Sequence, residues 1–193
     1  MYQLYLDTTN NKLTVLILQA NKILASSSFI AWQKQTELAI PTITNLLVKC
    51  KIKLKDISKV VIANGPGSYT GIRVAITFVK TLKVLNSFLT VFTINSLLLQ
   101  AGLIKSISVL SAYNNKSYLA VCDNGKIIIQ PQLVDENAKI GIISDLLDYK
   151  IIENLEKCNI VENFQKLSPY FIEVKNMEDL QPYYINDPFS SHN

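Results

Sequence analysis

The stretch from Gly65 to Arg73, which reads GPGSYTGIR, constrains the fold of this chain more than any other segment. It holds three of the six glycines and the only arginine in the sequence. It follows an apolar run, Lys59–Ala63, that is typical of a buried strand, and it leads into Gly71–Leu85, whose apolar spacing predicts a helix. Glycine permits close backbone approach and proline fixes φ, so we expect a rigid turn between strand and helix.

Three roles are open for this turn: nucleotide binding, nucleation of the helix, and contact with another protein. A glycine-rich turn before a helix can bind phosphate, but the Walker lysine is missing and the dinucleotide fingerprint has one residue too many. Ser68 and Thr70 can cap the helix. Arg73 opposes the helix dipole, so we expect it to pair with a specific partner. The motif residues are Gly65, Pro66, Gly67, Ser68, Tyr69, Thr70 and Gly71.

The helix after the turn is apolar around most of its circumference. A surface helix needs one apolar stripe, which faces its own sheet. A second stripe would have to meet another polypeptide, and Ala75 would allow a partner helix to approach closely. The alternative, a helix buried wholly within its own domain, stays open.

The order of predicted elements repeats along the chain and predicts mixed sheets packed with helices. In each half, three strands with hairpin signals precede a helix and a further strand. We therefore expect two related α/β lobes, residues 1–104 and a smaller 105–193 that ends in an extended tail from Pro182. The first half has strands at 2–7, 13–18, 23–30, 59–63 and 90–92, with helices at 36–50, 71–85 and 95–102. The second has strands at 107–112, 118–122, 126–130 and 149–152, and a helix at 140–147.

Within the first predicted helix, Pro41 is tolerable only in an early turn, so the helix is expected to start near Ile40. In the second half, Asp123–Gly125 is a strong hairpin signal.

The few metal-binding residues exclude several classes of chemistry. Cys50, Cys122 and Cys158 stand far apart, and the only histidine is His192. This excludes the usual zinc sites and catalysis by a well-held histidine. The odd cysteine count fits a reducing compartment, and neither a signal peptide nor a membrane span is apparent, so we expect a cytoplasmic protein with no metal and no membrane contact.

Basic charge is modest, with a net charge of +4. The nearest approach to a basic stripe is a lysine series between residues 49 and 59. It can be a solvated helix end and loop, or a weak RNA contact. Its members are Lys49, Lys51, Lys53, Lys55 and Lys59.

The motif is similar to the GPGSFTGLR signature of the TsaB (YeaZ-type) family. Weaker anchors occur in the family's order from one end of the chain to the other. They are Leu4–Thr9, which resembles the opening L-x-IDTS/T strand, Gln35–Pro41, which resembles H-x-x-x-LLP, Leu54–Ile57, which matches L-x-DI, and Pro182–Ile185, which resembles P-x-YLR.

The resemblance implies an actin/Hsp70-like fold and a non-catalytic subunit. In this family the subunit pairs with TsaD, its catalytic homologue, and works with the ATPase TsaE. Their complex transfers a threonylcarbamoyl group to the adenosine beside the anticodon of tRNA, which this subunit would contact only through the complex. Where the partner is missing, a hydrophobic helix face can instead pair two copies of the chain. The contact face implied by the family's helix pair comprises Ile72, Arg73, Ala75, Ile76, Val79, Leu38 and Thr42.

Departures from the family pattern affect the second lobe. The family's D-A-R-x-x-E-V-Y segment is replaced by Ser111–Tyr118, which lacks both acids. Asp7 is then the single remaining carboxylate of a degenerate nucleotide site, and no cofactor is expected. An ATP- or metal-dependent enzyme of the same fold, either a kinase-like ATPase or a peptidase, is the competing hypothesis. The family's C-terminal helix also has little room, so the second lobe is expected to be abbreviated.

Overall fold

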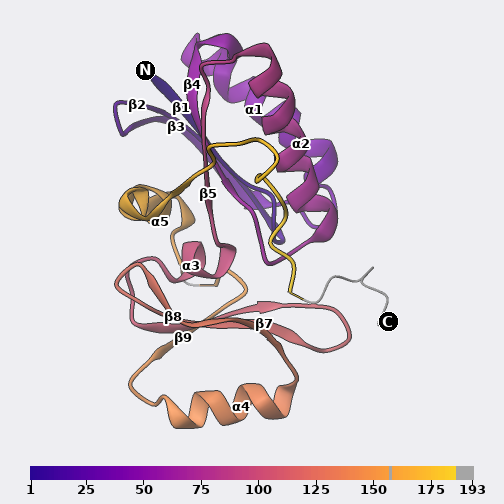
Figure 1. Ribbon diagram of the computed structural model, residues 1–193, viewed down its shortest axis with the longest axis vertical. Coiled ribbons are helices and arrows are strands. Elements are labelled where there is room, and N and C mark those ends of the chain that lie inside the picture. The colour runs from indigo at the N-terminus through magenta and orange to yellow at the C-terminus, as the bar shows by residue number, and fades with distance from the viewer. Residues whose placement is uncertain (157, 186–193) are drawn as a thin grey trace.

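The computed structural model describes residues 1–156 and 158–185, which form two mixed β-sheets with helices around them (Figure 1). The first sheet has the order β10-β5-β4-β1-β2-β3 and the second the order β8-β7-β6-β9. The first sheet consists of β1 (Tyr2–Asp7), β2 (Lys12–Gln19), β3 (Lys22–Ile30), β4 (Ile57–Ala63), β5 (Thr90–Ile94) and β10 (Ile172–Glu173). The second consists of β6 (Ser106–Ser111), β7 (Ser117–Asp123), β8 (Lys126–Val134) and β9 (Lys150–Glu153). The α-helices are α1 (Gln35–Cys50), α2 (Tyr69–Leu85), α3 (Ser96–Ala101), α4 (Glu136–Asp145) and α5 (Ile160–Lys166), and 3-10 turns span Leu54–Asp56 and Ser168–Tyr170.

Both sheets are built in the same way. Strands β1, β2 and β3 pair antiparallel, and β4 then pairs parallel with β1 after helix α1. Strands β6, β7 and β8 also pair antiparallel, and β9 pairs parallel with β6 after helix α4. The predicted repeat of an α/β unit is therefore present, and the second copy is the smaller one.

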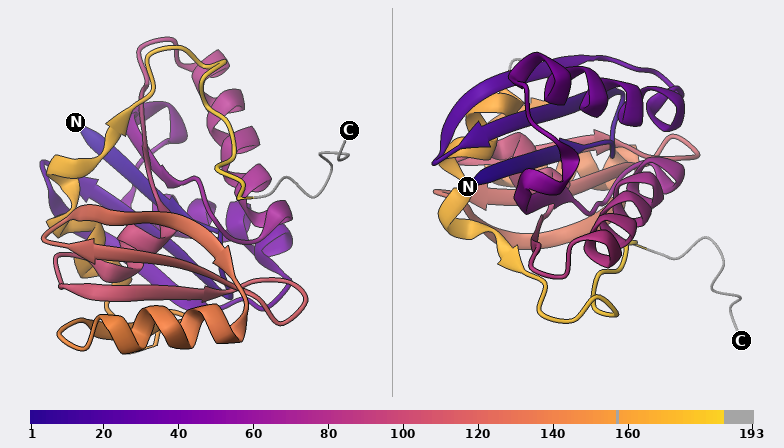
Figure 2. Two further views of the ribbon diagram at one scale, coloured as in Figure 1. Left: turned by 60° about the horizontal axis from the view of Figure 1, so that its bottom comes forward. Right: turned by 90° about the horizontal axis from the view of Figure 1, so that it is seen from above.

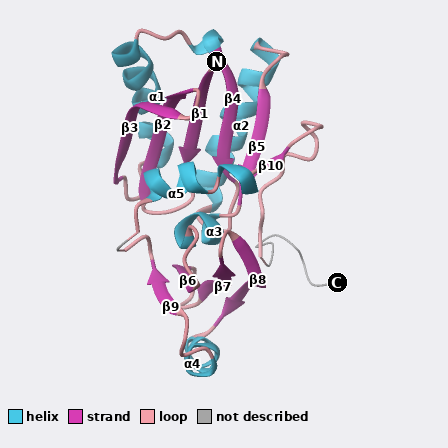
Figure 3. Ribbon diagram, turned by 90° about the vertical axis from the view of Figure 1, so that its left-hand side faces the viewer, coloured by secondary structure: helices cyan, strands magenta, loops and turns pink. Residues whose placement is uncertain are grey.

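The elements stack in alternating layers of helix and sheet. Because side chains alternate across a strand, Leu4 and Leu6 of β1 pack in the cluster formed with α1 and α2, whereas Tyr5 packs in the cluster between the sheets. Figure 3 shows α3 and α5 between the two sheets. Helix α4 covers the outer face of the second sheet, as the left view of Figure 2 shows, with Ile142 and Ile143 against its apolar cluster.

Helix α3 fixes the two lobes to each other. All of its residues are buried. The Gln100 side chain donates through Nε2 to Ser108 Oγ at 2.8 Å and to the Ile152 carbonyl at 2.9 Å. Its Oε1 accepts from the Leu155 amide. A single buried amide from the first lobe thus satisfies backbone and side-chain groups of the second, where an unpaired group would be costly.

Helix α2 begins two residues earlier than predicted, and α1 and α4 begin earlier by about one turn. Helix α1 begins at Gln35 and contains Pro41 in its interior. Its first turn is held by the Leu38 amide, which donates to the Lys34 carbonyl, and by Gln35 Nε2, which donates to the Asn10 carbonyl. Pro41 lacks a backbone donor and its ring crowds the carbonyl four residues earlier, yet the helix continues through it to Cys50. Helix α4 begins at Glu136 because the side chain of Asp135 caps it.

The C-terminal part of the chain returns to the first lobe. Strand β10 pairs antiparallel with β5, and the Tyr183 amide donates to the Asn64 carbonyl at 2.7 Å. Residues 186–193 of the predicted tail, with His192, lie outside the described residues. Strand β5 ends at Ile94 and β6 begins at Ser106. We propose that the first lobe gives way to the second within this crossing, at residues 104 and 105. The predicted second lobe, 105–193, is too long, because β10 belongs to the first sheet.

Candidate functional site

The motif turn is pressed against the turn between β1 and β2. A Cβ added at Gly67 would lie 2.2 Å from the Thr9 carbonyl oxygen, and one at Gly71 would lie 2.0 Å from the Thr8 carbonyl oxygen. No side chain fits at either distance. The glycines are therefore required by close contact between two backbone segments that are far apart in sequence.

Hydrogen bonds join the same two segments. The Ser68 amide donates to the Thr9 carbonyl at 2.6 Å, and Thr8 Oγ1 donates to the Gly71 carbonyl at 2.6 Å. Ser68 Oγ accepts from the Gly71 amide at 3.2 Å and caps α2, as predicted. Thr70, the second predicted cap, is exposed. The turn consequently nucleates the helix and clamps it to β1.

Asp7 lies beneath this clamp and is 1% exposed. Its Oδ1 accepts from the Thr9 amide at 2.8 Å and from Thr9 Oγ1 at 2.7 Å. Burial raises the pKa of the Asp7 carboxyl, and hydrogen bonds from Thr9 and Asn10 oppose that rise. The carboxyl group holds the end of β1, and its residue is absent from the lining of the cleft between the lobes.

Arg73 has partners within the chain. Its guanidinium Cζ lies 4.0 Å from the centroid of the Tyr69 ring, and its Nε donates to the Tyr184 hydroxyl at 3.2 Å. The rings of Tyr69 and Tyr184 stack with their centroids 5.2 Å apart. Arg73 therefore has specific partners, Tyr69 and Tyr184, within its own chain. The local sequence could not reveal Tyr184, because it lies 111 residues away.

The predicted contact face of α2 needs correction. Ile72, Ala75, Ile76 and Val79 are buried in the chain's own core against the first sheet. Their spacing of three and four residues is the stripe that a helix turns toward its sheet. On α1, two further predicted contacts, Leu38 and Thr42, are half-buried.

The face that α2 leaves open forms a groove with α1, with a volume of about 630 Å³. Ile40 of α1 is exposed there, and Val74 and Phe78 of α2 are half-buried. Among the described residues of the lining, Arg73 is the only ionisable cation and none is a carboxylate. These residues are Thr36, Ile40, Tyr69, Thr70, Arg73, Val74, Thr77, Phe78 and Thr81.

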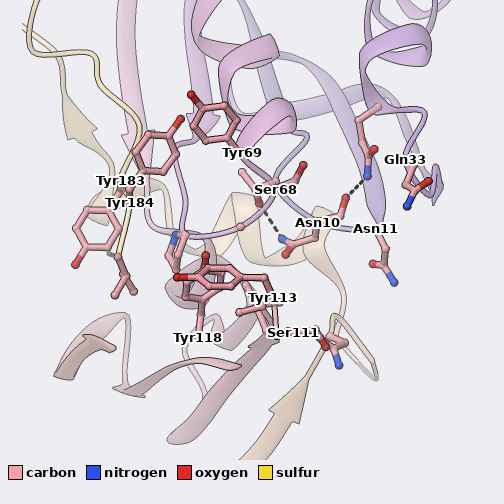
Figure 4. A pocket seen from close by; sticks show the side chains of 18 of the residues that line it. Asn10, Asn11, Gln33, Ser68, Tyr69, Ser111, Tyr113, Tyr118, Tyr183 and Tyr184 are labelled. Atoms are coloured by element: carbon pink, nitrogen blue, oxygen red, sulfur yellow. Dashed lines mark hydrogen bonds between the residues drawn. The ribbon is translucent and has the colours of Figure 1, made fainter. Parts of the chain in front are cut away.

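A second concave site, the interlobe cleft, has a volume of about 710 Å³ (Figure 4). The first lobe supplies the motif turn, Asn10 and Asn11 before β2, and Trp32 and Gln33 before α1. The residues that the second lobe supplies include Ser111, Tyr113 and Tyr118. These three residues belong to the segment that replaces the family's acidic one. The aromatic character of the cleft was not predicted, although Tyr113 in a polar turn was a usable signal.

The described residues of the cleft do not fit a magnesium nucleotide. Among those that line it, Glu156 is the only charged one. Among the described residues, no three His, Cys, Asp or Glu side chains gather as a metal site. A hard cation needs several oxygen ligands with carboxylates among them, and a polyphosphate needs cations or unpaired amides.

The lysine series is split between different environments. Lys49, Lys51, Lys53 and Lys55 are exposed near the end of α1. Lys59 Nζ instead lies 4.3 Å from the centroid of the Phe92 ring, and burial lowers its pKa. No helix in the described part of the chain is long and apolar enough to span a membrane.

The stacked sheets and the motif turn define a two-lobed α/β protein of the actin/Hsp70-like class, which confirms the predicted fold class. YeaZ from Pseudomonas aeruginosa superimposes with a TM-score of 0.68 at 16% identity, over 95% of this chain and 99% of that one. A family model described as TsaD, tRNA N6-adenosine threonylcarbamoyltransferase, matches residues 29–165.

Curated relatives agree with this match. The chain is 27% identical to the uncharacterized protein MG208 of Mycoplasma genitalium over 97% of this chain and 96% of that protein. It is 37% identical to the tRNA threonylcarbamoyladenosine biosynthesis protein TsaB of Bacillus subtilis over 41% of this chain and 34% of that protein. The chain belongs to the TsaD family, and within it to the TsaB/YeaZ type.

Proposed function

We propose that this chain is a non-catalytic subunit in the biosynthesis of threonylcarbamoyladenosine in tRNA, and that it binds a TsaD-type protein through the groove between α1 and α2. The observation that carries the proposal is the groove itself. Its floor is apolar and its rim carries hydroxyl groups. The named TsaB relatives support the pathway.

The chemistry of the groove suits another helix pair. Ile40, Val74 and Phe78 offer apolar surface that water would otherwise cover, and burying such surface drives association. Threonines at the rim are short enough to let a ridge of partner side chains enter. Arg73, held by Tyr69 and Tyr184, presents a preorganised cation at one end. Alone, two copies of the chain can pair through the same face, as isologous dimers do.

The absence of catalysis is supported by the state of the carboxylates. Asp7 is buried and hydrogen-bonded to Thr9, and Glu156 has no acidic neighbour among the described residues that line the cleft. Kinase-like and metallopeptidase chemistry both require grouped ligands. Hydrogen bonds from the Gln100 side chain also join the two lobes. We propose that catalysis resides in the TsaD-type partner, and that the ATPase TsaE and tRNA are reached through the complex.

The test is binding of the full chain to TsaD and TsaE from the same organism, measured by calorimetry and size-exclusion chromatography. In Thr77→Glu, an exposed groove position of α2 receives a carboxylate that the interface would desolvate, and that would pair with Arg73 one helical turn earlier and divert this cation from the partner. We expect affinity for TsaD to fall about tenfold or more, with an unchanged melting temperature. Val84→Glu is the matched control, because Val84 lies on the same helix, is 85% exposed, and is outside the groove lining.

Equal affinity of Thr77→Glu and the wild type for TsaD would place the contact elsewhere. Threonylcarbamoyl transfer by the chain alone would overturn the non-catalytic assignment.

A further inference from the structure

The segment at residues 180–185, which we call the C-terminal strap, crosses the first lobe beside α2 (Figure 2). Its first residue, Leu180, is fully buried in the core cluster that includes the inner side of α2. Further along, the Tyr183 amide donates to the Asn64 carbonyl at 2.7 Å, just before the motif turn. The strap is therefore anchored at two points on the first lobe, although it follows the second lobe in the sequence.

The first glycine of the motif makes room for this strap. A Cβ added at Gly65 would lie 2.5 Å from the Tyr183 carbonyl oxygen, and the φ of Gly65 is 115°. Both the close approach and the positive φ require glycine. Gly67 and Gly71 instead meet the turn between β1 and β2. The motif turn is thus shaped by two distant segments, and the strap is one of them.

Tyr184 extends the strap to the end of the groove between α1 and α2. Its ring stacks on that of Tyr69, with the centroids 5.2 Å apart and an angle of 19° between the planes (Figure 4). Its hydroxyl accepts from Arg73 Nε at 3.2 Å, and Arg73 Cζ lies 4.0 Å from the centroid of the Tyr69 ring. Tyr69 and Arg73 belong to the groove lining, so Tyr184 reaches the groove through them.

An arginine that is held before a partner arrives loses less freedom on binding than a mobile one. Long charged side chains lose rotamer entropy when an interface orders them. The hydroxyl of Tyr184 and the ring of Tyr69 hold the exposed Arg73 side chain. A planar guanidinium in a fixed orientation suits a carboxylate, which it can bind with two parallel hydrogen bonds.

We propose that the C-terminal strap is part of the partner-binding site, in which Tyr184 positions Arg73 to bind a carboxylate of the TsaD-type protein. The inference rests on the proposed function of the groove. Tyr184 is a positioning residue, because its hydroxyl acts on the partner through the guanidinium group. The groove supplies apolar area, and the strap fixes a charged contact at its end.

Because Arg73 is the sole arginine of the chain, its positioning can be tested without a partner. In a proton–nitrogen correlation NMR spectrum of the full chain, the Nε–H group of Arg73 gives a single arginine signal. Tyr184→Phe removes the hydroxyl acceptor and keeps the stacked ring. We expect the signal to shift and its heteronuclear NOE to fall, because the side chain gains fast motion. Tyr113→Phe, the same change on the second lobe, is the matched control and should leave the signal in place.

The consequence for assembly is measured as a dissociation constant for TsaD. Tyr184→Phe should weaken binding about threefold to fivefold, the effect of one hydrogen bond that orders a charged group, and Arg73→Ala should weaken it about tenfold or more. In the double variant, the loss should equal that of Arg73→Ala alone, because Tyr184 acts through the arginine. Melting temperatures of all variants verify folding.

The outcomes distinguish the strap from the groove. An unchanged arginine signal in Tyr184→Phe, or wild-type affinity of this variant for TsaD, would overturn the role of Tyr184 and leave the groove as the binding site. An equal loss from Tyr184→Phe in the presence and absence of the Arg73 side chain would mean a purely structural role and would also overturn it. A wild-type chain that does not bind TsaD would overturn the proposed function and this role together.

Discussion

Gly71 occupies a position where the chain leaves no room for a methyl group. It lies in the first turn of α2, directly against the Thr8 carbonyl. Gly141 is also helical, but it has open space around it: nothing lies within 4 Å of the position that a Cβ would take. The two glycines therefore separate the effect of close packing from that of helix propensity.

We expect Gly71→Ala to lower the free energy of unfolding by about 2–3 kcal/mol, because the backbone of β1 or α2 must shift to admit the methyl group. Gly141→Ala should raise it by about 0.5–1 kcal/mol, since alanine favours an exposed helix. Urea denaturation measures both. Equal effects in the two variants would mean that the motif turn does not press on Thr8.

The buried Asp7 carboxyl predicts a particular dependence of stability on pH. Its pKa is raised above the ordinary value of 3.8 by burial, so the native state binds its proton more tightly than the unfolded chain does. Its contribution to stability is fully present below pH 3.8 and is lost as pH rises through the native pKa.

Asp7→Asn removes this titration. The unfolding free energy of the variant, minus that of the wild type, should therefore increase with pH across the same window, by up to about 1.4 kcal/mol per pH unit. Urea titrations at a series of pH values measure the difference, which cancels all other titrating groups. A difference that is flat with pH would show that the carboxyl keeps its ordinary pKa.

Residue-level prediction succeeded where the cause was local. The glycine cluster indicated a tight turn, and Ser68 was a recognisable cap. The partners of these residues were not predictable, because Thr8, Thr9 and Tyr184 reach the motif only through the fold. The orientation of Asp7 away from the cleft has the same origin.

At the scale of elements, α2 shows how a helix can be apolar on most sides and still bury one stripe. Val79 lies on the side of α2 that faces the sheet and is fully buried. Phe78, the residue before it, lines the groove and is half-buried. The face that the family resemblance implied as the partner contact contains this buried stripe. The apolar period could not correct that expectation, because period alone does not say which of two stripes meets the sheet.

Val79→Glu should accordingly unfold the monomer rather than merely disrupt assembly. Placing a carboxylate in the core with no partner costs about 3 kcal/mol or more. Circular dichroism and urea denaturation of Val79→Glu and Thr77→Glu compare the buried and open faces of one helix. A folded Val79→Glu chain that merely fails to bind TsaD would restore the original assignment.

Strands and hairpins were the most predictable elements. Asn124 and Gly125 both have positive φ, at 46° and 76°, as the hairpin signal between β7 and β8 requires. Helix α5 and strand β10 were missed. Both are short, and α5 is held by Asn163, whose Nδ2 donates to the Leu99 and Gln100 carbonyls. Contacts of this kind leave no periodic trace in the sequence.

At the scale of the whole molecule, the two lobes share one apolar cluster. Tyr5 and Val61 of the first sheet and Leu110 and Cys122 of the second belong to it, together with α3. The internal repeat revealed two lobes from sequence. It could not reveal that their sheets face each other across a helix, because packing partners depend on the tertiary arrangement.

The shared cluster predicts one cooperative unfolding transition. Trp32 fluorescence reports on the first lobe. Cys122 reports on the second, because burial raises the pKa of its thiol to about 12 and keeps it unreactive while folded. With Cys50 and Cys158 replaced by serine, the urea midpoints of fluorescence and thiol labelling should coincide. Labelling of Cys122 at lower urea would mean that the second lobe opens by itself.

The return of the chain to its starting lobe also has a consequence for synthesis in the cell. Strand β10 and the ring of Tyr184 complete the first sheet and the motif turn, yet both are synthesised after all the other strands of that sheet. The N-terminal lobe therefore cannot mature as an early, independent unit while the rest of the polypeptide is still being made. A nascent chain stalled before residue 172 would leave β5 as an unpaired edge of the first sheet, which is open to pairing with other chains.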